Sequence, residues 1–93
     1  MLDYDAQDFI GRKYRMILDV NKIHTTELGV QRIKRNLDLI TDDVVGWCRD
    51  QISQSEKIVR KGKNWYAYAS DAVITVNAHS FTIITAHKQK YKD

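Results

Sequence analysis

The sequence predicts an α+β domain in which two or three helices pack on one face of a three- or four-stranded antiparallel sheet. Apolar residues recur at helical spacing in the first half of the 93-residue chain, whereas residues 60–88 show the two-residue alternation of strands. The segments between the expected strands are short, so an antiparallel meander is the simplest pairing. Helices that precede the strands, rather than alternate with them, are typical of an α+β protein.

The segment before the main helices has the least regular pattern. Ile10, Tyr14 and Ile17 lie at helical spacing. Asp5 suits a helix N-terminus, where a carboxylate meets the positive end of the helix dipole. Residues 1–15 are therefore either a lead-in helix or a frayed arm, and the pattern leaves both open.

Two helices are expected next, each preceded by capping residues. His24-Thr25-Thr26-Glu27 and Thr41-Asp42-Asp43 both offer side-chain oxygens to the unpaired N–H groups of a first helical turn. An apolar stripe follows each of these starts. The first stripe is Val30, Ile33, Leu37 and Ile40, and the second is Val44, Val45, Trp47, Cys48 and Ile52.

The single cysteine is expected to be structural. Cys48 lies four residues from both Val44 and Ile52, which places it on the inward side of the second helix as a small apolar side chain. One cysteine can form neither an intramolecular disulfide nor a multi-cysteine zinc site. The chain also has no Gly-rich phosphate loop and no His-x-x-x-His pair, so we expect no metal and no cofactor.

The second half contains four strand-like runs joined by short turns. Gly62, which follows Lys61, supplies the positive φ that a tight hairpin needs. Ser70-Asp71 and residues 78–80 are the other turns. The expected strands are residues 57–60, 64–69, 72–77 and 81–87.

Side chains on a strand alternate between the two faces of its sheet, so each strand can be divided in two. In the second strand, Trp65 separates from Tyr66 and Tyr68. In the last strand, the alternation groups Phe81, Ile83, Thr85 and His87 on one face, and Thr82, Ile84, Ala86 and Lys88 on the other. A one-residue bulge would reverse this assignment, so the face that carries His87 stays undecided.

The charges are unevenly distributed along what we expect to be a single domain of residues 1–93. Its helical half is residues 16–56, its sheet half is residues 57–88, and residues 89–93 form a basic tail. Residues 1–56 carry eight Lys or Arg against ten Asp or Glu, whereas the remainder carries seven against two. A basic surface attracts polyanions such as RNA.

Membrane insertion and secretion are not expected. No apolar run approaches the roughly 20 residues that span a bilayer. The N-terminus is acidic, unlike that of a signal peptide. The sequence therefore predicts a cytoplasmic protein without a membrane partner.

Four motifs in the chain occur together in one known family. They are Thr26-Glu27-Leu28, Gly62-Lys63-Asn64-Trp65-Tyr66, Ile74-Thr75-Val76-Asn77 and the run from Phe81 to Thr85. In these motifs the chain resembles a bacterial family known as domain of unknown function 3781, over roughly residues 23–88. The resemblance implies a fold but no activity, because none is assigned to that family.

A second likeness concerns architecture alone. Helices followed by a four-stranded meander are similar to the plan of the barnase/EndoU/colicin/RelE-like ribonucleases, which place His, Lys or Arg, and Thr or Ser on one sheet face. Here Thr85, His87 and Lys88 end the last strand. Many unrelated functions share such a plan, so this likeness only motivates a hypothesis.

That hypothesis is RNA cleavage without a metal ion. The reaction needs a base for the 2′-hydroxyl, an acid for the leaving oxygen and a cation for the phosphate. The candidates are His87 and His79 for proton transfer, Lys63 or Arg60 for the phosphate, and Thr85 to orient the histidine. With His79 in a turn, His87 would lie roughly 20 Å away at ~3.3 Å per residue, so His87 would need another partner, such as His24 or a basic residue of the first hairpin.

Binding without catalysis is the favoured hypothesis. Cations beside exposed rings can hold the phosphates and stack on the bases of RNA. The candidate binding residues are Arg60, Lys61, Lys63, Tyr66, Tyr68, His79 and Lys88, whereas Trp65 is expected in the core. The alternative is a protein–protein interaction or dimerisation module that uses an edge strand or an apolar patch.

Overall fold

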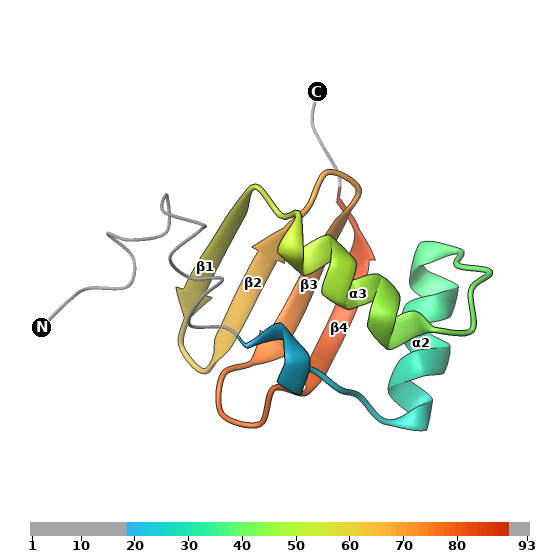
Figure 1. The fold of residues 1–93 in the computed structure, drawn as a ribbon, viewed down its shortest axis with the longest axis horizontal. Helices are drawn as coiled ribbons and strands as arrows, with labels where there is room; N and C mark the ends of the chain where they lie inside the picture. Colours follow the sequence, from blue (N-terminus) through green and yellow to red (C-terminus); the bar gives the residue numbers. More distant parts are fainter. Residues whose placement is uncertain (1–18, 90–93) are drawn as a thin grey trace, which may run out of the picture.

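The computed structural model describes residues 19–89, in which two α-helices precede a four-stranded sheet (Figure 1). This confirms the predicted α+β arrangement. The expected lead-in segment at residues 1–15 and the tail beyond Gln89 lie outside the described residues. The elements are the 3-10 turn η2 (Val20–Lys22), α2 (Glu27–Leu37), α3 (Val44–Ser53), β1 (Lys57–Lys61), β2 (Asn64–Tyr68), β3 (Ala72–Asn77) and β4 (Ile83–Lys88).

Helix α2 begins where the capping residues predict, but it ends before the last residue of the predicted apolar stripe. The hydroxyl of Thr26 accepts a 3.0 Å hydrogen bond from the Gly29 N–H, which caps the first turn. The helix stops at Leu37 because Asp38 adopts the left-handed conformation, with φ 55° and ψ 42°. The prediction that Ile40 continues the stripe is therefore wrong, and this side chain is 96% exposed in the loop beyond.

Helix α3 lies across one face of the sheet (Figure 1). The Asp43 carboxylate caps it by accepting from the Gly46 N–H at 3.0 Å. Its inward side carries Val44, Cys48 and Ile52, all buried at the spacing of one helical turn. Neither helix in residues 19–89 combines the length and the apolar character that crossing a membrane requires.

The sheet is an antiparallel meander with the strand order β1-β2-β3-β4. Its register aligns Ile58, Ala67, Ile74 and Ala86 in one row across the strands, and all four are completely buried. Trp65, 2% exposed, lies on the same face, as the two-residue period predicts. These residues and the apolar sides of α2 and α3 form the core.

A β-bulge in β4 decides which side chains face the core. Thr75 pairs with Thr85 and Val76 pairs with Ile83, which leaves Ile84 as the extra residue. Ile83 and Ala86 are therefore both buried against the helices, although simple alternation would separate them. The predicted grouping of Ile83 with Thr85 and His87 is wrong, because the bulge reverses the faces between them.

The outer edge of β4 is covered by the chain segment that leads into α2 and by α2 itself (Figure 1). The His24 N–H donates to the Phe81 carbonyl at 3.1 Å, and the Ile83 N–H donates to the His24 carbonyl at 2.8 Å. Further along the strand, the Asn36 amide donates to the Ala86 carbonyl at 3.2 Å. These bonds satisfy edge groups that would otherwise be available to another strand.

The first prediction concerns the tight turn between β1 and β2. Gly62 has a φ of 59° and has no atom within 4 Å of the point where a β-carbon would lie, so a side chain there meets conformational strain but no clash. We expect Gly62→Ala to lower the free energy of unfolding by about 1 kcal/mol. Gly62→Asn should cost less, because asparagine tolerates this conformation better. Urea titrations that gave equal losses for both variants would contradict the assignment.

The second prediction concerns Cys48. Burial raises the pKa of its thiol to about 12 from an ordinary value of 9.0, and only the thiolate reacts readily. We expect the native protein to resist a thiol reagent at pH 8 and the urea-unfolded protein to react fully. Above pH 9 the unfolded chain releases this proton and the folded chain keeps it, so the thiol makes the free energy of unfolding fall as the pH rises towards 12.

Cys48→Ala provides the control for this effect. Because alanine cannot ionise, the stability difference between wild type and Cys48→Ala should shrink between pH 9 and pH 10.5. A difference that stayed constant over this range would show that the thiol does not titrate differently in the two states.

Candidate functional site

The face of the sheet opposite α2 and α3 carries most of the polar and aromatic strand residues, and we call it the open face. The strand register arranges it in three rows. The rows are Lys57, Tyr68, Val73 and His87; Val59, Tyr66, Thr75 and Thr85; and Lys61, Asn64 and Asn77.

Two tyrosines and two lysines dominate one side of the open face. Tyr66 and Tyr68 are both partly exposed and lie two residues apart on β2. Lys57 and Lys61 are exposed at the two ends of the neighbouring strand β1. The Lys57 Nζ lies 5.4 Å from the centre of the Tyr68 ring, within the range of a cation–π contact. This part of the sheet therefore places rings and positive charges next to each other.

The other predicted cations have different positions. Arg60 lies on the core side of β1, where its guanidinium is 5.4 Å from the centre of the Trp65 ring and its Nε donates to the Gly62 carbonyl. Lys63 is exposed in the β1–β2 turn. Lys88 also lies on the helix side of the sheet and forms a 2.9 Å ion pair with Asp38. Of the four cations predicted to bind, Lys61 alone belongs to the open face.

The three histidines are separated. His87 lies on the open face near the end of β4, opposite Val73, and Thr85 lies two residues away on the same face. His79 is exposed in the β3–β4 turn at the other end of the sheet, and the adjacent Ala78 N–H donates to the Lys63 carbonyl. The structure therefore brings Thr85 and His87 together but does not bring Lys63 or His79 to them.

His24 does not approach His87 but joins a hydrogen-bonded chain at the β3–β4 turn. Its Nδ1 donates to the Lys22 carbonyl at 3.0 Å, and its Nε2 lies 3.1 Å from the Thr82 hydroxyl. The Ser80 hydroxyl continues the chain to Thr82 at 2.8 Å. This network fastens the segment before α2 to the turn. Sequence reasoning missed it, because His24 and Thr82 are 58 positions apart.

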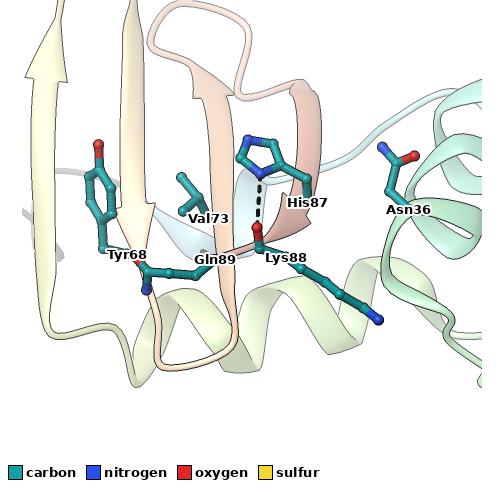
Figure 2. Close-up of a pocket in the computed structure, with 6 residues that line it drawn as sticks. All are labelled: Asn36, Tyr68, Val73, His87, Lys88 and Gln89. Carbon is teal, nitrogen blue, oxygen red and sulfur yellow. Dashed lines mark hydrogen bonds between the residues drawn. The ribbon is translucent and has the colours of Figure 1, made fainter. Parts of the chain in front are cut away.

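A cavity of about 750 Å³ opens at the His87 end of the open face (Figure 2). Its lining residues are Asn36, Tyr68, Val73, His87, Lys88 and Gln89. The His87 Nδ1 lies 3.2 Å from the Lys88 carbonyl. Because a carbonyl oxygen only accepts, Nδ1 is the donor in this contact, and Nε2 is an acceptor whenever the ring is uncharged.

Sequence reasoning also missed several residues of the open face and of the cavity. Lys57 could have been found from its even spacing to Lys61 on one strand. Asn36 gave no such signal, because it reaches the cavity only through the packing of its helix against a strand that is distant in the sequence. Within residues 19–89, no three His, Cys, Asp or Glu side chains are grouped in a way that could hold a metal ion.

Comparison with known families gives a match over residues 17–87, to a family described as protein of unknown function (DUF3781). The chain belongs to this family. The match extends from before η2 to His87 in β4, so it includes both helices and nearly the whole sheet. It confirms the resemblance seen in the sequence motifs.

The DUF3781 domain gave no match among curated proteins or among solved structures. The likeness to the ribonuclease plan therefore has no support beyond the order of helices and strands. The open face and its cavity are the features from which a function has to be inferred.

The third prediction separates open-face residues of the DUF3781 domain from core residues. Trp65 is 2% exposed, so Trp65→Ala should lower the free energy of unfolding by about 3–5 kcal/mol. Tyr68→Ala, on the open face, should cost about 1 kcal/mol or less. Equilibrium urea unfolding of both variants measures this difference. Equal losses would mean that Tyr68 is a core residue.

Proposed function

We propose that this domain binds single-stranded RNA through the open face of its sheet. The observation that carries the proposal is the position of Tyr66 and Tyr68, two partly exposed rings on the face that the helices do not cover. Aromatic side chains on a sheet surface are stacking platforms for unpaired bases. A structural role alone would favour burying such rings in the core, as happens with Trp65.

The charges beside the rings support the same function. Lys57 and Lys61 flank the tyrosines along β1, and both ammonium groups are exposed. A strand rises ~3.3 Å per residue, so these lysines are roughly 13 Å apart along the strand. This spacing allows them to contact different phosphates of one extended strand, whose bases then lie over the sheet.

Cleavage of RNA requires more chemical groups at one place than binding does. It needs two proton-transfer groups and a cation at one phosphate. His87 and Thr85 share the open face, whereas Lys63 and His79 lie at the other end of the sheet. We therefore propose binding without cleavage, in a cytoplasmic protein.

The fourth prediction tests this proposal with a labelled single-stranded hexanucleotide. We expect saturable binding whose affinity falls with salt. Replacing Lys57 and Lys61 together with alanine should weaken binding and should reduce the slope of log K against log salt by roughly 1.4, because each phosphate contact to a single strand contributes about 0.7. Fluorescence anisotropy at four or more salt concentrations measures both quantities.

The matched control is the Arg32→Ala/Arg35→Ala variant. It removes the same charge from exposed positions of α2, outside the three rows of the open face, and should leave the slope unchanged. Equal effects of the two double variants would show that RNA binding depends on the net charge of the protein and not on the open face. Absence of RNA binding, together with a concentration-dependent dimer in sedimentation, would favour the protein-interaction alternative, for which the exposed Leu28 and Ile40 are candidate contacts.

A further inference from the structure

The cavity beside His87 is lined by two rings, and we call the space between them the slot. Tyr68, Val73 and His87 lie in one row on three adjacent strands, so the two rings flank the short side chain of Val73. Figure 2 shows all three on the same side of the sheet. Val73 is only 8% exposed, which makes it the apolar floor between two taller walls.

The spacing of the strands leaves room for one inserted ring between Tyr68 and His87. Directly paired residues of neighbouring strands have Cα atoms about 5 Å apart, so the Cα atoms of Tyr68 and His87 are roughly 10 Å apart. Stacked rings prefer centre-to-centre distances of about 4.5–7 Å. A planar ring placed above Val73 would therefore lie about 5 Å from each wall. The middle row of the open face offers only one such wall, because Thr85 takes the place of the second ring.

Two side-chain amides that line the cavity are each held by a hydrogen bond to a strand or turn carbonyl. The Asn36 amide donates to the Ala86 carbonyl, and the Gln89 amide donates to the Ala69 carbonyl. Each of these amides keeps a carbonyl oxygen as an acceptor, and the Nε2 of His87 is a further acceptor when the ring is uncharged. Acceptors around an apolar slot suit a flat ligand with N–H groups on its edge, which describes a nucleobase.

We propose that Tyr68, Val73 and His87 form a slot for a single nucleobase at the end of the RNA-binding face. This inference rests on the proposed function and names a subsite within it. The slot would hold one base of the strand by stacking, and the lysines of β1 would hold phosphates further along the same strand.

The test compares two small probes by nuclear magnetic resonance. Adenosine monophosphate and ribose 5-phosphate share the sugar and the phosphate but differ in the base. We expect adenosine monophosphate to shift the amide signals of Tyr68, Val73 and His87 in a saturable way, and ribose 5-phosphate to leave them in place. Equal shifts with both probes would overturn the slot.

Two variants change the slot in independent ways. Val73→Phe fills it, and His87→Ala removes one wall. Each should weaken the binding of adenosine monophosphate about tenfold, in line with the energy of one base–aromatic stack. The controls are Ile40→Phe, which adds the same ring to an exposed loop, and Gln31→Ala, which removes an exposed polar side chain from α2 that does not line the cavity. Unchanged affinity in both slot variants would overturn the proposal.

Failure of the slot and failure of the proposed function give different results. A hexanucleotide that binds wild type, Val73→Phe and His87→Ala equally, and that loses affinity in the Lys57→Ala/Lys61→Ala variant, overturns the slot and supports the proposed function. A hexanucleotide that binds none of these proteins overturns the proposed function, and the mononucleotide titration then decides the slot by itself.

Discussion

The bulge at Ile84 is the constraint on which the arrangement of this domain depends. The helices need both Ile83 and Ala86 from β4, and an unbroken strand would place these two residues on opposite faces. One extra residue brings both into the core and turns Thr85 and His87 to the opposite side. The composition of the open face is thus a consequence of how the core is filled.

Much of the fold could be predicted, because its signals are local. Thr26 and Asp43 cap the helices as their positions suggest, and Gly62 forms the turn that its conformational freedom allows. The errors came from residues whose conformation is not determined by their type. Asp38 ends α2 in a left-handed conformation without being a glycine, and two adjacent isoleucines in β4 give no hint of which one is the extra residue.

The candidate site was harder to predict than the fold. Proximity along the chain grouped Arg60, Lys61 and Lys63, but the strand places Arg60 on the core side and the turn places Lys63 beyond the rows of the sheet. The period of two correctly separated Trp65 from Tyr66 and Tyr68, because all three lie on one regular strand. The cavity combines a helix residue with three strands, and no pattern within one segment contains that information.

The dependence of α2 on β4 has a consequence for synthesis of the chain. Asn36 binds a carbonyl 50 residues further on, so α2 leaves the ribosome long before its docking surface exists. At ~5–20 residues per second this delay is roughly 3–10 s. A helix of 11 residues is marginal in water by itself. The nascent helical half therefore lacks the complete surface that buries Ile33 and Leu37 until the last strand has been translated.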